Sequence, residues 1–162
     1  MKTAVFIAAV LLTASAAFGA NSADVVGPWK TEGESSLVEF FNCGDKLCGK
    51  VVWLKNPNYV AKGDGPVGMQ KVDLKNPDPA LRKRPIIGLQ VIEGLTPTGK
   101  NSWEKGTCYD PESGNSYQCK IRLESPDRLE VRGFIGFSLI GRTYVLTRKE
   151  KMASTQTNTP HP

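Results

Sequence analysis

The stretch SLVEFFNCGDKLCGKVVWL, residues 36–54, decides the fold class. Two runs rich in β-branched and aromatic residues flank Gly44-Asp45, a dipeptide that is typical of a tight turn. Apolar and polar side chains alternate in much of each run, as they do in a strand with one buried face. The stretch therefore predicts an antiparallel hairpin with strands at 36–42 and 47–54.

The chain repeats this pattern on both sides of the hairpin. Short β-prone segments are separated by turns that contain Gly, Pro, Asn or Asp, and no segment shows sustained helical periodicity. The glycines and prolines of 56–72 indicate a loop, and a short helical turn is expected near 79–82. The other predicted strands are 26–32, 86–92, 102–109, 116–123, 129–135 and 140–148.

Alternation also predicts a buried face for each strand. The predicted sheet has one apolar face, no helix to cover that face and few features that would protect its edge strands. These properties favour a sheet that closes on itself. We therefore predict an all-β, eight-stranded antiparallel up-and-down barrel in one domain, residues 24–150. Side chains fill such a barrel, or it holds one small ligand. The inward-facing residues that would line a ligand pocket are Phe40, Trp53, Leu89, Val91, Ile121, Val131 and Val145.

Residues 1–20 have the composition of a secretory signal peptide. Lys2 precedes an apolar run at 4–12, and small residues lead to a cleavage site after Gly19 or Ala20. That run is short for a membrane span, and no later run approaches the required length. We therefore expect a periplasmic or secreted protein, with a polar and structureless tail at 151–162.

Four cysteines in an exported chain predict disulfides rather than a metal site or a redox pair. Neither a Cys-x-x-Cys spacing nor a set of further metal ligands is present. Three pairings are open to four cysteines, and symmetry about turns favours the local ones. We predict that Cys43 pairs with Cys48, and Cys108 with Cys119 across a turn at 112–115.

The two ends of the predicted barrel carry a cue for its closure. Gly27-Pro28-Trp29 in the first strand and Thr147-Arg148 in the last resemble the lipocalin pattern, in which a late Arg covers the first-strand Trp. The expected contact is a cation–π stack of Arg148 on Trp29.

Residues 73–91, DLKNPDPALRKRPIIGLQV, combine turn formers, acids and guanidinium groups before an apolar strand. Prolines and side-chain caps should make 76–79 a rigid turn. The forks of Arg82 and Arg84 can reach back to Asp73 and Asp78 as charge-assisted pairs. The stretch is therefore a candidate for a structural plug or for a functional rim of the barrel.

Spaced motifs over nearly the whole mature chain resemble one known family. They are CGKVVWL at 48–54, Asp73, NPDP at 76–79, LR at 81–82, RP at 84–85, IG at 87–88, Trp103, YDP at 109–111, SG at 113–114, Tyr117, VRG at 131–133, Gly136, GRT at 141–143 and TR at 147–148. On these motifs the chain resembles the exported bacterial family catalogued as domain of unknown function 2147. The resemblance implies a calycin-like or lipocalin-like barrel, periplasmic or secreted, without an assigned reaction. Its structural signature includes Asp73, Asn76, Asp78 and Asp110. The long loop at 56–72 and Glu104-Lys105, where the family often has glycine, depart from the pattern.

Catalytic chemistry is not favoured by these residues. The single histidine, His161, lies in the tail, so a Ser–His or Cys–His pair is not expected. Acid–base work by carboxylates needs only the right separation and a raised pKa, which keeps Asp73, Asp78, Glu104 and Asp110 as candidates. Asp78 and Asp110 are more simply explained as turn caps. We predict no enzyme, no cofactor and no metal site.

The preferred function is that of a small-ligand carrier. Removal of the leader takes away one Lys, which leaves 20 basic and 16 acidic residues, and these are interleaved rather than gathered into a nucleic-acid footprint. The expected ligand is apolar or amphipathic and lipid-like, with an acidic end met by Arg82, Arg84 or Arg132. The alternative is a filled barrel that serves as an envelope structural or protein-interaction module.

Overall fold

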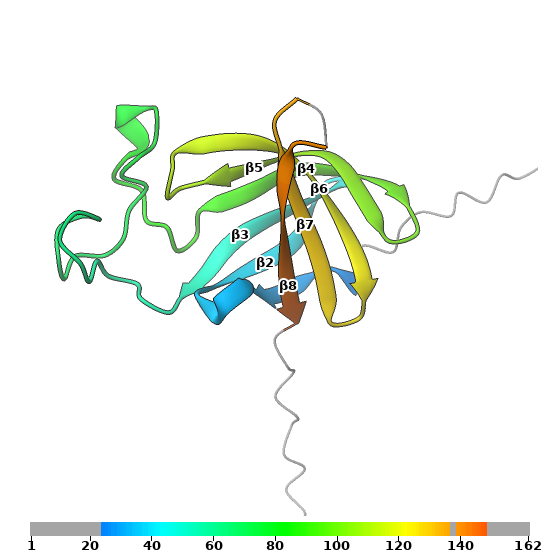
Figure 1. Ribbon diagram of the computed structural model, residues 1–162, viewed down its shortest axis with the longest axis horizontal. Helices are drawn as coiled ribbons and strands as arrows, with labels where there is room; N and C mark the ends of the chain where they lie inside the picture. Colours follow the sequence, from blue (N-terminus) through cyan, green and yellow to red (C-terminus); the bar gives the residue numbers. More distant parts are fainter. Residues whose placement is uncertain (1–23, 137–138, 149–162) are drawn as a thin grey trace, which may run out of the picture.

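The computed structural model describes residues 24–136 and 139–148 and has eight antiparallel strands closed into a barrel (Figure 1). Each strand pairs with the next along the chain, and β8 pairs with β1. The strands are β1 (Gly27–Lys30), β2 (Ser36–Cys43), β3 (Lys46–Leu54), β4 (Gln90–Gly99), β5 (Ser102–Asp110), β6 (Asn115–Ser125), β7 (Arg128–Phe134) and β8 (Gly141–Arg148). The predicted fold class is confirmed. The predicted leader at 1–20 and tail at 151–162 lie outside the described residues.

The antiparallel order sorts the connections onto two ends of the barrel. Two-residue turns at 44–45, 100–101 and 126–127 lie at one end, which we call the closed end. The β1–β2, β3–β4, β5–β6 and β7–β8 connections lie at the other, which we call the loop end. The 3₁₀ helices η2 (Glu32–Glu34) and η3 (Pro79–Leu81) belong to the first two of these connections. Within the described residues, no helix has the length and apolar character that a membrane crossing requires.

Large apolar side chains fill the inner face toward the closed end. They come from strand segments near the two-residue turns and from β1, and each is almost completely buried. They are Trp29, Phe40, Leu47, Leu95, Trp103, Ile121 and Leu129. Their burial removes a large apolar area from water, which is the main favourable term in the folding of such a sheet.

The barrel closes as the chain ends predict. Trp29 pairs with Arg148 across β1 and β8, and the Arg148 guanidinium carbon lies 4.2 Å from the centroid of the Trp29 ring. The Trp29 indole donates to the Val25 carbonyl at 2.8 Å. Arg148 donates to the backbone carbonyls of Pro126, Val26 and Asp24. The predicted cation–π closure is confirmed.

Two of the predicted inward-facing residues lie on the outer face instead. A register shift between Leu37 and Val38 places Trp53 opposite Leu37, although Val51 lies opposite Val38. This extra residue in β3 turns Trp53 outward, where it is 44% exposed. Val145 pairs with Glu130, so it also lies on the outer face, and its inward-facing neighbour is Leu146.

The fourth strand begins and ends later than predicted. The predicted strand at 86–92 is replaced by β4, because Gly88 takes a φ of 95° and the Leu89 N–H donates to the Ile86 carbonyl in a turn. Ile87 is consequently exposed, whereas Leu89 and Val91 are buried. The later end reflects pairing of Pro97 with Trp103, near the turn at 100–101.

The two cysteine hairpins differ from each other. The Cys43–Cys48 disulfide is confirmed, but the predicted Cys108–Cys119 disulfide is not formed and both thiols are free. The reason lies in the β5–β6 turn: Gly114, with a φ of 76°, donates to the Asp110 carbonyl and closes a loop at 111–114. Cys108 then faces Tyr117 rather than Cys119. A hydrogen bond between the thiols lowers the pKa of Cys108 and raises the pKa of Cys119.

Candidate functional site

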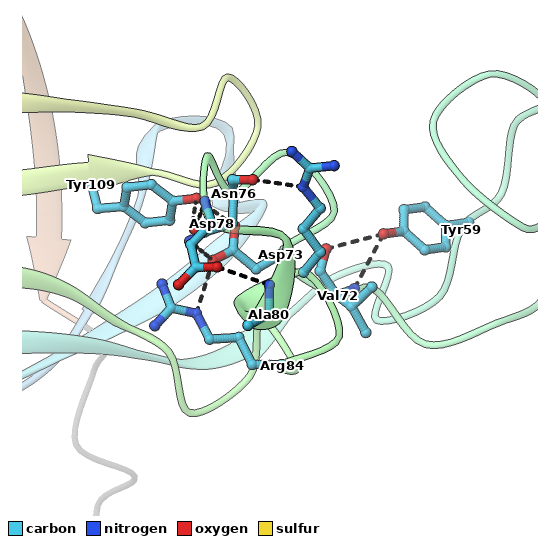
Figure 2. A network of polar contacts seen from close by, with 9 residues as sticks. Tyr59, Val72, Asp73, Asn76, Asp78, Ala80, Arg84 and Tyr109 are labelled. Carbon is cyan, nitrogen blue, oxygen red and sulfur yellow. Dashed lines mark hydrogen bonds and ion pairs between the residues drawn. The ribbon is translucent and has the colours of Figure 1, made fainter.

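A buried polar cluster lies at the loop end, where the β3–β4 connection meets β5 (Figure 2). Its centre is Asp73, whose side chain is 0% exposed. One carboxylate oxygen accepts from Asn76 Nδ2 at 2.8 Å and from Arg84 Nε at 2.9 Å, and the other accepts from the Tyr109 hydroxyl at 2.5 Å. We call Asp73, Asn76, Arg84 and Tyr109 the Asp73 cluster. Three charge-assisted hydrogen bonds offset the desolvation of the buried carboxylate.

Local sequence builds one side of this cluster. Asn76 Oδ1 accepts from the Asp78 N–H at 2.9 Å, and Asp78 Oδ1 accepts from the Ala80 N–H at 2.9 Å and so caps η3. The predicted turn at 76–79, the short helical turn and the Arg84–Asp73 pair are confirmed. Arg82, however, donates to the Asn76 carbonyl at 2.7 Å and does not pair with Asp78.

The β5–β6 turn supplies the other side. Asp110 accepts from the Glu112 N–H at 2.9 Å and from the Ser113 hydroxyl at 2.6 Å, so its predicted role as a turn cap is confirmed. A Cβ added at Gly114 would overlap the Lys75 carbonyl oxygen. This close backbone approach brings the Tyr109 hydroxyl onto Asp73 from 36 residues away in the sequence. Burial, followed by the hydrogen bond to Asp73, raises the pKa of Tyr109.

Sequence reasoning missed Tyr59, which organises the loop at 56–72. Its hydroxyl donates to the Val72 carbonyl at 3.1 Å and accepts from the Val72 N–H at 3.2 Å. A Cβ at Gly65 would lie 2.6 Å from the Tyr59 ring, so the chain folds tightly over that ring. The available signal was an aromatic residue isolated in a glycine-rich loop, which indicates an anchor but not its partner.

A cavity of about 270 Å³ adjoins the Asp73 cluster on the outer wall of the barrel. Glu93 pairs with Thr107 across the outer faces of β4 and β5, and both line it. Arg84 lines it as well, with its guanidinium carbon 5.8 Å from the centroid of the Tyr109 ring. The full lining is Asn76, Pro77, Arg84, Gln90, Val91, Glu93, Thr107, Tyr109 and Ser116.

A second cavity, of about 500 Å³, lies over the outer face of β5 to β8. Lys120 pairs with Arg132 and Arg122 with Glu130, so its wall carries both basic and acidic side chains. Arg132 donates to the Thr143 hydroxyl at 2.9 Å and to the Leu139 carbonyl at 3.3 Å. This face is a ladder of charges that is open to solvent.

The structure does not bring the predicted ligand-binding residues together. Phe40, Ile121 and Val131 face inward and are buried, whereas Leu89 and Val91 are buried near the β3–β4 connection. Trp53 and Val145 lie on the outer face. The three arginines are separate: Arg82 is exposed on the loop, Arg84 belongs to the Asp73 cluster, and Arg132 lies over β7 and β8. Among the described residues, no three His, Cys, Asp or Glu side chains gather as metal ligands.

Three other inward-facing positions were also missed. Tyr117 and Gly133 lie in register with Cys108 and Cys119, and Tyr144 lies opposite Val131. Alternation from Ile121, Val131 and Leu146 would have placed them on this face. Alternation does not predict whether they are exposed, because exposure depends on how much of the inner face the core side chains cover.

The eight-stranded closure with Arg148 on Trp29 defines a lipocalin-like barrel. A family model described as "Uncharacterized protein conserved in bacteria (DUF2147)" matches residues 27–148, and the chain belongs to this family. Among solved structures, it is similar to protein HP1028 from the human pathogen Helicobacter pylori, which is described as belonging to the lipocalin family. The two are 25% identical with a TM-score of 0.64, over 77% of this chain and 82% of that chain. No curated protein sequence matches the chain.

Proposed function

We propose that this protein is an exported, non-enzymatic barrel that binds one small apolar or amphipathic ligand, of lipid-like chemistry, through its inner face at the loop end. One observation carries the proposal. Tyr144 lies in register with the buried, inward-facing Val131, yet it is 48% exposed. Solvent therefore reaches the inner face at the middle of β8, and a ligand can enter by the same route.

Two glycines of the inner face, both opposite Cys119, show that its packing is not uniform. A Cβ at Gly106 would lie 2.7 Å from Leu95, so packing already fills that position. A Cβ at Gly133 would meet only Cys108 Sγ at 3.5 Å and Tyr117 Cβ at 3.8 Å, which are ordinary contacts. The inner face thus accepts an added methyl group at Gly133 but not at Gly106. Small-molecule sites commonly lie in the mouths of β-barrels.

The Asp73 cluster supports a binding role over an enzymatic one. A general base must reach a substrate proton, but both Asp73 oxygens already accept hydrogen bonds and the side chain is fully buried. Asp110 is likewise engaged in its turn. The proposed export rests on the leader-like composition of residues 1–20 and on the Cys43–Cys48 disulfide, a bond typical of oxidising compartments.

The filled closed end favours the second candidate, a barrel that serves as an envelope structural or protein-interaction module. The core formed by Trp29, Phe40, Trp103 and their apolar neighbours leaves no room for a ligand that would penetrate to the closed end. The two candidates differ in whether the loop end of the inner face is occupied by a ligand.

A matched pair of substitutions separates them. Val131→Trp enlarges an inward-facing residue, and Val145→Trp makes the same change on the outer face. Under the ligand hypothesis, a fluorescent fatty acid binds the parent and Val145→Trp with one-to-one saturation, and Val131→Trp abolishes binding while the protein still folds.

The module hypothesis gives a different pair of results. The parent shows no saturable binding, and overpacking destabilises Val131→Trp by about 1 to 3 kcal/mol in a denaturant titration. That combination would end the ligand proposal.

A further inference from the structure

The cavity beside the Asp73 cluster has a wall that carries both signs of charge. Arg84 contributes a cation from the β3–β4 connection, and Glu93 contributes an anion from the outer face of β4. Neutral polar side chains of Gln90, Thr107 and Ser116 share the lining with them. The volume of about 270 Å³ is near the roughly 300 Å³ that forms the lower limit of ordinary ligand pockets. The cavity therefore suits one small polar molecule.

Arg84 is held in place before any ligand arrives. Its Nε donates to Asp73 at 2.9 Å and its guanidinium lies beside the Tyr109 ring, so the side chain loses little freedom on binding. Within the described residues, its two terminal nitrogens donate no hydrogen bond. A guanidinium presented in this way is suited to a carboxylate.

Glu93 is the complementary group. It is exposed on the outer face opposite Thr107, and it forms no ion pair with any residue in 24–136 or 139–148. A ligand with only a negative charge would meet Glu93 unfavourably, and a ligand with only a positive charge would meet Arg84 unfavourably. A molecule that carries both charges satisfies both groups, which is how opposed charges give specificity.

We propose that this cavity binds a small zwitterion of the size of a free α-amino acid, with the carboxylate on the terminal nitrogens of Arg84 and the ammonium group on Glu93. Thr107, Ser116 and Gln90 provide neutral donors and acceptors around it. The site lies on the outer wall of the barrel and is separate from the inner face, so it does not depend on the ligand proposed above.

The first test titrates the ¹⁵N-labelled protein with each of the standard α-amino acids and follows the amide signals of Glu93, Thr107 and Ser116. For the strongest binder, two matched analogues are then compared: its carboxamide, which lacks the negative charge, and its deaminated acid, which lacks the positive charge. We expect each analogue to bind at least about tenfold more weakly. The proposal is overturned if no amino acid shifts these signals, or if all three molecules bind equally.

The second test uses Glu93→Gln, which removes the anion and leaves the Asp73 cluster intact. Its matched control is Glu104→Gln, the same change at an exposed residue of the other outer cavity. We expect Glu93→Gln to weaken amino-acid binding about tenfold and to leave binding of the deaminated acid unchanged or stronger. We expect the control to bind as the parent does. Equal losses in both variants, or no loss in Glu93→Gln, would show that Glu93 does not hold the ammonium group.

Discussion

Two arginines lie beside aromatic rings in this barrel, and the two regions hold them in opposite ways. Arg148 covers Trp29 with its guanidinium carbon 4.2 Å from the ring centroid, and its donors go to backbone carbonyls. Arg84 lies 5.8 Å from the centroid of Tyr109, and its Nε goes to the buried carboxylate of Asp73. At the first site the buried group is an apolar ring, and at the second it is a charge.

This difference determines what each arginine contributes. Without Arg148, whose side chain is half-buried, water can solvate the carbonyls that now accept its hydrogen bonds, and Trp29 still packs against the apolar core. Without Arg84, the Asp73 carboxylate loses its only salt-bridge partner among the described residues and stays fully buried. A buried charge without a partner is strongly destabilising, whereas a lost cation over a ring is not. Removal of the arginine should therefore lower the free energy of unfolding more at the loop end. Removal of the aromatic ring should lower it more at the closed end.

The largest expected effect is at the ring of the closed end. Trp29→Ala leaves a large cavity in the filled part of the core and should destabilise the fold by about 3 to 5 kcal/mol. Arg148→Lys should also destabilise it, by about 1 kcal/mol or less, because an ammonium group cannot stack in the plane of the indole. Denaturant titration measures both values. If both variants unfolded like the parent, the closure would not stabilise the barrel.

Arg84→Ala should destabilise the protein by about 2 to 4 kcal/mol, because Asp73 remains buried with only neutral donors. The double variant Asp73→Asn/Arg84→Ala removes the charge as well and should recover part of that loss in a double-mutant cycle. Arg148→Ala is the matched control at the closed end. If Arg148→Ala proved as harmful as Arg84→Ala, the distinction between the two sites would be lost.

The docking of the loop on the β5–β6 turn can be tested at Gly114. Gly114→Ala introduces a Cβ that overlaps the Lys75 carbonyl at a φ of 76°, and should destabilise the fold by about 2 to 3 kcal/mol. Gly44→Ala in the β2–β3 turn has a similar φ of 73° but nothing within 4 Å, so only the backbone strain of about 1 kcal/mol applies. Thermal melts of Gly114→Ala and Gly44→Ala separate the effect of backbone strain, which both variants share, from the effect of steric overlap, which only Gly114→Ala has. Equal shifts would mean that the turn does not support the Asp73 cluster.

The smallest effect concerns the Tyr109 hydroxyl. Tyr109→Phe removes a hydrogen bond to a carboxylate and should destabilise the protein by about 1 to 2 kcal/mol at neutral pH. Since burial and Asp73 raise the pKa of Tyr109, the folded state holds this proton more tightly than the unfolded state does. Its contribution is fully present below about pH 10, the ordinary tyrosine pKa, and is lost as the pH rises through the raised folded value.

Thermal melts at neutral pH and above pH 10 test whether the stabilisation by the Tyr109 hydroxyl is lost as the pH rises. The parent should lose more stability than Tyr109→Phe over that interval, so that the two curves converge at alkaline pH. Parallel losses in the two proteins would contradict the assigned hydrogen bond.

Much of the fold and part of the candidate site follow from the sequence, because they depend on short-range patterns. Alternation and turn residues predict seven strands close to their observed positions, and the Asx turns at Asn76 and Asp78 need only their own neighbours. The Arg84–Asp73 pair spans 11 residues, within reach of one folded loop. The contact between Arg148 and Trp29 joins residues that are far apart in the sequence. It can still be predicted, because β1 and β8 are the first and last strands of the predicted order and closure of the barrel brings them together.

Only the tertiary structure decides features that depend on register or on packing density. One bulge in β3 turns Trp53 outward, and the position of Gly114 in its turn sets Cys108 opposite Tyr117. The Tyr109 hydroxyl meets Asp73 because the β5–β6 turn docks on the loop. A strand has a period of two, so one inserted residue reverses every face beyond it, and local sequence carries no record of that choice. The sequence by itself therefore determined a closed β-barrel with an arginine-capped tryptophan, and the three-dimensional packing decided which side chains face its interior.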